Sequence, residues 1–166
     1  MKKLASRTAQ WPLVAEFAFD FNDWVVDSVS GVKKTFGSTV ALSKDPTEAG
    51  LTAGTGVVFD CIALPPGSVI VGGELIVETA FVGIGAGATL DLGIAGATSG
   101  LISAFDLDAA AANARSALLL TTALQANGGA NLRLTTAGLT ATATAGKARI
   151  RVMYTIDGRS NEVNGA

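Results

Sequence analysis

A chain of 166 residues in which 49% are apolar and only 16% are charged is too hydrophobic to remain disordered, and it is long enough to bury one core. Its formal net charge of −2 gives no overall attraction to nucleic acid or to an anionic membrane. The sequence has no histidine and one cysteine, Cys61, which excludes a histidine general base, a Cys–His nucleophile pair, an intrachain disulfide and a cysteine-based zinc site. We therefore expect a single domain that is not an enzyme and uses no cofactor.

The first fifteen residues are expected to form an arm in front of the folded domain. Their positive opening lacks the apolar run of a signal peptide, and no segment of the chain reaches the ~20 apolar residues that cross a bilayer. Trp11-Pro12 is a potential apolar anchor, because large aromatic side chains are common at protein interfaces. The other reading of this segment is a frayed terminus with Trp11 packed on its own domain. The candidate contacts with a neighbouring subunit are Lys2, Lys3, Arg7, Trp11 and Pro12.

Much of the chain that follows alternates between apolar and polar residues, which predicts β-strands because successive side chains on a strand point to opposite faces. The segment 57–64 instead is apolar on both faces, and Cys61 within it is expected to be a small buried hydrophobic residue. A long strand over 68–81 is predicted to contain a bulge or bend at Gly72-Gly73. Along the alternating segments, the residues expected to face the core are Phe17, Phe19, Phe21, Leu90, Leu92, Ile150, Val152, Tyr154 and Ile156.

Two segments between the strands need separate treatment. The glycine-rich segment 82–88 resembles a dinucleotide-binding fingerprint, but that motif requires a helix to follow, and residues 89–94 alternate as a strand. A loop is therefore expected there. The alanine-rich segment 106–113 favours a short helical turn in a crossing loop. Simple turns are predicted at Pro65-Pro66-Gly67, Asn127-Gly128-Gly129 and Asp157-Gly158.

Acidic residues gather at two places that invite a chemical interpretation. Asp20, Asp23 and Asp27 lie close together in sequence, but no flanking cation or partner base marks one of them as a tuned acid or base. A solvated strand end is therefore expected. Asp106 and Asp108 lack the ligand number and the glycine of an EF-hand calcium loop, so helix capping or solvation is the expected role.

Short strands separated by turn signals predict a β-sandwich or barrel. No repeat or shift in composition divides the chain further, so we expect an arm over 1–15, one β-sandwich over 16–157 and a polar tail over 158–166. The low charge suggests that part of the surface is covered by copies of the same chain, in a homo-oligomeric dimer or trimer.

The order of motifs in the second half of the chain resembles the capsid decoration, or cement, proteins of tailed bacteriophages. A strand with the pattern PPG…GGE…VETAF over 65–81 precedes a final strand with the pattern AGK…V.Y.IDGR.NE over 145–162. The resemblance covers residues 57–162, and residues 1–56 match no pattern of the family. It implies an all-β, jelly-roll-like antiparallel β-sandwich that sits on the outside of an icosahedral head and clamps subunits of the major capsid protein.

We therefore expect a structural protein of the virion, made in the host cytoplasm and bound to the capsid surface. Its partners would be the major capsid protein and copies of itself, with neither nucleic acid nor membrane among them. The alternative is a receptor- or carbohydrate-binding β-sandwich module of a phage tail fibre or spike. Such modules stack sugar rings on exposed aromatic side chains, and here aromatic residues are 6% of the chain, with Trp11 and Trp24 as the spare candidates.

Overall fold

A computed structural model describes residues 11–28, 31, 33–36, 57–120, 125–126 and 130–156. The predicted turns at 127–129 and 157–158 and the tail over 158–166 lie outside these ranges. The described residues contain strands and no helix. The strands are β1 (Leu13–Asp20), β2 (Trp24–Val26), β3 (Lys33–Thr35), β4 (Val58–Leu64), β5 (Ser68–Val82), β6 (Thr89–Ile94), β7 (Ala97–Asp106), β8 (Arg115–Ala117), β9 (Gln125–Ala126), β10 (Ala130–Ala137) and β11 (Ala145–Ile156).

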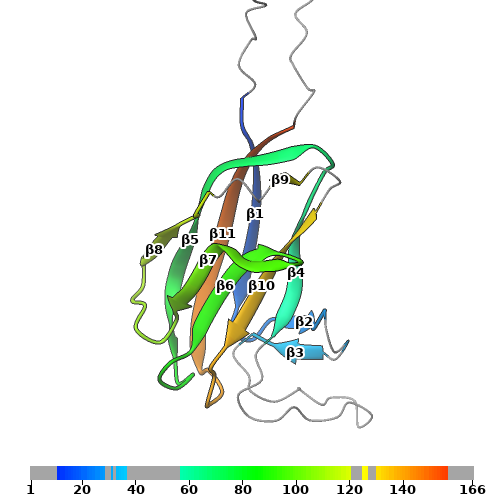
Figure 1. Cartoon of the computed structure of the whole chain (residues 1–166). Helices are drawn as coiled ribbons and strands as arrows, with labels where there is room; N and C mark the ends of the chain where they lie inside the picture. Colours follow the sequence, from blue (N-terminus) through cyan, green and yellow to red (C-terminus); the bar gives the residue numbers. More distant parts are fainter. Residues whose placement is uncertain are drawn as a thin grey trace, which may run out of the picture.

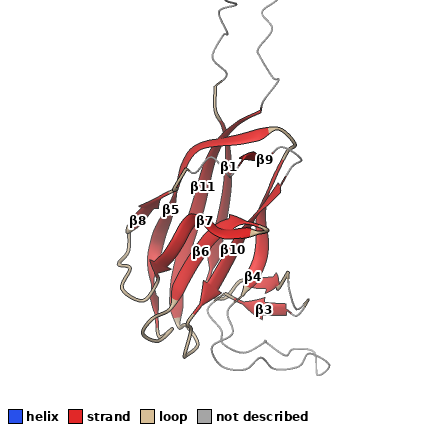
Figure 2. Ribbon diagram, in the orientation of Figure 1, coloured by secondary structure: helices blue, strands red, loops and turns tan. Residues whose placement is uncertain are grey.

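The strands form two antiparallel sheets that lie face to face (Figures 1 and 2). One sheet has the order β1-β11-β5-β8, with β9 also paired to β5, and the other has the order β4-β10-β6-β7. The short hairpin β2–β3 lies at the bottom of the sandwich in Figure 1. The expectation of an all-β protein with two antiparallel sheets is confirmed.

The antiparallel pairs are nested along the chain. β1 pairs with β11, β4 with β10, β5 with β8 and β9, and β6 with β7. The strands β1, β4, β5 and β6 of the first half of the chain therefore pair, in reverse order, with strands of the second half. As a result, β1 begins and β11 ends at the same end of the sandwich, the top in Figure 1.

The core lies between the two sheets and follows the predicted alternation. Ile150 and Val152 of β11 are fully buried, while Arg149 and Arg151 between and beside them keep contact with solvent. Leu90 and Leu92 of β6 are fully buried from the opposite sheet. Tyr154, two residues before the end of β11, is only partly buried. Period-two burial of both facing sheets is what creates a single apolar layer.

An aromatic cluster fills one end of this core. Phe36, which directly follows β3, is 2% exposed. Its ring stacks on Phe19 of β1 at 4.3 Å and meets Phe59 of β4 edge-on at 4.5 Å, measured between ring centroids. Phe17 lies 5.6 Å from Phe59. The hairpin β2–β3 is therefore tied to both sheets through one aromatic side chain.

Bulges explain the two segments whose sequence pattern was irregular. In β4, Ile62 pairs with Leu132 but Asp60 pairs with Arg133, so Cys61 is an extra residue and the alternation changes phase there. This phase change is why 57–64 looks apolar on both faces. In β5, Ile70 and Gly72 pair with consecutive residues of β11, which makes Val71 the extra residue. The predicted irregularity is confirmed, one residue before Gly72.

The prediction of a helical turn over 106–113 was wrong. Asp106 ends β7, and its side chain accepts a hydrogen bond from the Ala109 amide at 2.9 Å, but no helix follows. Leu107 and Ala110 are instead buried in the sandwich, where they anchor the loop that crosses from β7 to β8. Asn113 adopts a φ of 67°, and its amide donates a hydrogen bond to the Val77 carbonyl of β5 at 2.6 Å. Tertiary burial thus overrides the helix propensity of four alanines, which is too short a run to nucleate a helix alone.

Candidate subunit-contact surface

The structure places two of the five predicted contact residues. Trp11 is 84% exposed and Pro12 is also exposed, so Trp11 does not pack on its own domain. Lys2, Lys3 and Arg7 lie outside the described residues. β1 begins at Leu13, so the last three residues of the predicted arm pair with β11 as part of the sheet.

An exposed apolar row crosses the outer face of the β1-β11-β5-β8 sheet near this end. Val14 of β1 is 56% exposed and lies directly opposite Met153 of β11, which is 37% exposed. Val71, the bulge residue of β5, continues the row and is also exposed. Together with Trp11, these residues are the apolar part of what we call the outer face. The sequence could have indicated that Met153 faces outward, because it lies two residues after Arg151 and four after Arg149 and so shares their face of the strand.

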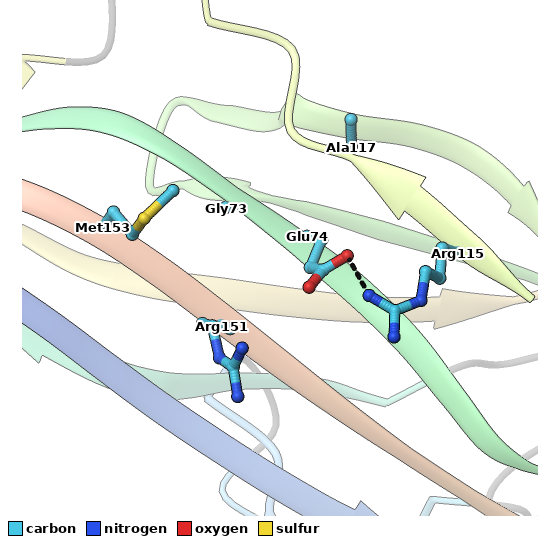
Figure 3. Close-up of a pocket in the computed structure, with 6 residues that line it drawn as sticks. All are labelled: Gly73, Glu74, Arg115, Ala117, Arg151 and Met153. Carbon is cyan, nitrogen blue, oxygen red and sulfur yellow. Dashed lines mark hydrogen bonds and ion pairs between the residues drawn. The ribbon is translucent and has the colours of Figure 1, made fainter. Parts of the chain in front are cut away.

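Charged side chains occupy the rest of the outer face and pair with one another. Arg151 of β11 bonds Glu16 of β1 at 2.6 Å, and Arg115 of β8 bonds Glu74 of β5 at 2.9 Å, the pair drawn in Figure 3. Since Arg151 is also the register partner of Glu74, the signs alternate from Glu16 to Arg115 across four strands. Opposite charges across neighbouring strands stabilise the sheet modestly. The four charges of this ladder sum to zero.

A second charge cluster lies further along the same face. Glu78 of β5 accepts a hydrogen bond from Arg149 and forms an ion pair with Lys147 at 3.1 Å, and both cations belong to β11. The three side chains remain partly exposed. The outer face therefore consists of internally paired charges with one unpaired apolar row at its end.

A hollow of about 550 Å³ lies on the outer face between Met153 of the apolar row and the charged residues Glu74, Arg115 and Arg151. Gly73 is among its lining residues, and Figure 3 shows Met153, Arg151, Glu74 and Arg115 around it. A side chain at position 73 would place its Cβ 2.3 Å from the Arg151 carbonyl oxygen, so this position has to remain glycine. The hollow offers shape and paired charges, and its lining supplies no nucleophile.

A second, apolar hollow of about 440 Å³ opens at the side of the sandwich where β1 faces β4. Phe17 and Phe59 reach it from the two sheets, and Val25 and Val26 reach it from β2. Asp60 lies on its rim. Its lining residues are Phe17, Val25, Val26, Ser28, Phe59 and Asp60.

Asp60 is held as a carboxylate by its neighbours. Partial burial raises its pKa, but hydrogen bonds from Arg133 and Asn131, at 3.0 Å and 3.2 Å, and the charge of Arg133 outweigh that effect. The pKa of Asp60 therefore lies below its usual 3.8. A carboxyl group that stays ionised in this way cannot serve as a proton donor near neutral pH.

The acidic residues Asp20, Asp23 and Asp27 have structural roles. Asp20 and Asp23 form the turn after β1, in which the Asp23 side chain accepts the Asp20 amide at 2.7 Å. Asp27 is only 2% exposed and accepts the Val58 amide at 2.9 Å, which corrects the expectation that all three are solvated. Among the described residues, no group of histidine, cysteine and carboxylate side chains is arranged to hold a metal ion.

The remaining candidates for chemistry are also structural. Burial raises the pKa of the Cys61 thiol to about 12, and the thiol donates to the Leu132 carbonyl at 3.2 Å, so it remains protonated and unreactive. Gly83, Gly85 and Gly87 all have φ between 82° and 87° in a loop that leads into β6. The predicted loop is thus confirmed, and no helix follows it to bind a pyrophosphate. Within the described ranges, no helix has the length and hydropathy to cross a membrane.

Two solved structures resemble this fold. A chain of the cyanophage Pam1 capsid asymmetric unit is 16% identical, with a TM-score of 0.51 and alignment over 94% of each chain. A chain of the Ralstonia phage GP4 capsid is 17% identical, with a TM-score of 0.44 over 95% of this chain and 93% of that one, which is too weak to add to the argument. The Pam1 likeness shows a shared fold. No family model and no curated protein sequence matches the chain.

Proposed function

We propose that this protein is a capsid decoration protein of a tailed bacteriophage, which binds the outside of the head and stabilises the lattice of the major capsid protein. The observation that carries the proposal is the composition of the outer face. Its charges are paired within the chain, so its unused binding capacity is the apolar row of Val14, Met153 and Val71 beside the exposed Trp11. Such a surface suits contact with another protein subunit.

The architecture supports this function. We infer that the sandwich is a jelly roll, because the nested pairs and the orders β1-β11-β5-β8 and β4-β10-β6-β7 are what two wrapped Greek keys produce. Jelly rolls are frequent in viral capsid proteins. The likeness to a chain of the Pam1 capsid points in the same direction over nearly the whole length of both chains.

The mechanism requires no chemistry. A protein that binds the assembled lattice, and not the free subunits, adds its binding free energy to the stability of the shell by mass action. In this proposal the segment 1–15 with Lys2, Lys3, Arg7, Trp11 and Pro12 contacts a neighbouring subunit, and copies of the chain associate as a dimer or trimer with at least about 1,000 Å² buried at each contact.

The tail-fibre alternative receives less support from the aromatic residues. Trp11 precedes β1 at the top of Figure 1, and Trp24 begins β2 at the bottom, so the two indoles do not form one stacking platform. A glycan-array screen separates the two functions. Binding to a glycan without binding to heads would favour the fibre module.

The test of the proposed surface uses heads that lack the protein. Met153→Lys places a charge in the apolar row without changing the core, and we expect it to weaken co-sedimentation with heads at least about tenfold. Val82→Lys is the matched control, because Val82 is 52% exposed at the other end of β5. Equal loss of binding in both variants, or in neither, would refute the assignment of this row as the contact.

A further inference from the structure

The outer edge of β1 offers backbone groups that no described strand uses. β1 is the terminal strand of its sheet and pairs only with β11. The amide of Phe21 donates a hydrogen bond to the Gly146 carbonyl at 2.9 Å. Because such pairs alternate along an antiparallel ladder, the odd-numbered residues of β1 direct their amides and carbonyls toward β11, and the even-numbered residues direct theirs away from it. The Asp20 amide is used by the Asp23 side chain. Val14, Glu16 and Ala18 therefore present their amides and carbonyls outward.

The edge of β4, the terminal strand of the other sheet, is partly covered by side chains of another segment. In β4, the Val58 amide bonds the Asp27 side chain at 2.9 Å and the Asp60 amide bonds the Ser28 hydroxyl at 3.1 Å. The segment 27–28 thus covers the start of the β4 edge. β1 has no such cover among the described residues, and within the strand it carries neither proline nor lysine, the residues that commonly protect an exposed edge.

The apolar hollow lies directly beside this edge. A strand added to β1 would direct alternate side chains toward the gap between the sheets, where Phe17, Val25 and Val26 form an apolar lining. The remaining side chains would lie on the outer face beside Glu16. Backbone pairing provides affinity in strand addition, and pockets for alternate side chains provide specificity.

Charge decides what kind of strand fits. The β1 edge and the turn after it carry the carboxylates of Glu16, Asp20 and Asp23, and among described residues the cation paired with any of them is Arg151. A second copy of β1 added about a two-fold axis at Glu16, the middle of this edge, would pair Val14 with Ala18 and Glu16 with itself. Like charges directly opposite one another destabilise a strand pair. A basic segment removes this conflict.

We propose that the outer edge of β1 binds an extended segment of a different protein, with apolar residues at alternate positions and a lysine or arginine opposite Glu16. The segment becomes an additional strand of the β1-β11-β5-β8 sheet. Its inward side chains fill the hollow lined by Phe17, Val25 and Val26. This site shares Val14 with the row around Met153 on which the proposed function rests, but it uses the backbone groups of β1 and the hollow lined by Phe17, Val25 and Val26, which that row does not include.

The experiment selects binders for the folded full chain from a displayed library of random decapeptides. We expect enriched peptides to alternate apolar residues and to contain lysine or arginine. Ala18→Pro removes the outward amide and leaves the ladder to β11 intact, so it should weaken the selected peptides at least about tenfold in calorimetry. Ala18→Ser, the matched control, should bind within twofold of the original chain.

Three outcomes would overturn the proposal. The first is that no peptide is enriched, and the second is that selected peptides bind Ala18→Pro as well as Ala18→Ser. The third is a concentration-dependent dimer that Ala18→Pro abolishes, which would make a second copy the occupant. If Ala18→Pro fails to fold, hydrogen exchange on the original chain decides instead: bound peptide must protect the amides of Val14, Glu16 and Ala18. Because no heads are used, failure here leaves the proposed function standing.

Discussion

At the scale of single residues, several polar side chains in the described part of the chain serve the fold. Asp27 closes the start of β4, and Asp60 holds Arg133 on the adjacent strand. Carboxylates that could have formed an acid–base pair are thus used as hydrogen-bond acceptors. Among the described residues, exposed apolar side chains such as Val14 and Met153 remain available for contact with another protein.

Cys61 provides a direct chemical test at this scale. Its pKa is raised from 9.0 to about 12, so the folded state favours the neutral thiol. The associated stability is fully present below pH 9 and is lost as the pH rises towards 12. We expect iodoacetamide to alkylate the native protein far more slowly than the urea-unfolded chain at pH 8. Equal rates in the two states would show that the thiol is not protected as described.

At the scale of elements, the sequence predicted the regular strands and missed those defined by distant partners. Ile150 and Val152 revealed β11 because a strict period of two is a local signal. β7 was missed because Gly100 and the positive φ of Ala104 break that period. The short strands β8 and β9 exist only through their pairing with β5. The edge position of β1 also depends on the sheet order, which no local pattern encodes.

The hairpin β2–β3 yields a prediction about packing. Phe36 lies in the aromatic cluster between β1 and β4, and truncating it leaves a cavity that both sheets border. We expect Phe36→Ala to lower the free energy of unfolding by about 3–5 kcal/mol in urea denaturation. Leu119→Ala, at a side chain that is 56% exposed, should change it by less than about 0.5 kcal/mol. Similar effects of the two substitutions would mean that Phe36 is not part of the core.

At the scale of the whole molecule, the two ends of the described chain lie together. Trp11 leads into β1 beside the last strand, next to the apolar row on the outer face. The proposed contact therefore combines an arm with a sheet surface at one end of the sandwich. The sequence predicted the arm from composition, but it could not place that arm beside Met153, because their proximity comes from the pairing of β1 with β11.

Deleting residues 1–12 separates the arm from the sheet, since the deletion ends before Leu13 and leaves β1 complete. We expect the midpoint of thermal unfolding to stay within about 2 °C, because Trp11 is exposed and contributes little to the fold. Binding to heads should weaken by more than tenfold. Unchanged binding and unchanged heat protection of the heads would place the contacts on the sandwich alone.

The proposed function requires the protein to recognise an assembled shell. The most direct measurement titrates the full chain against heads that lack it and, in parallel, against unassembled major capsid subunits, and it records both binding and the temperature at which the heads break open. We predict saturable binding to heads, a higher disruption temperature and no measurable binding to free subunits. Absence of binding to heads, or equal affinity for free subunits, would contradict the account.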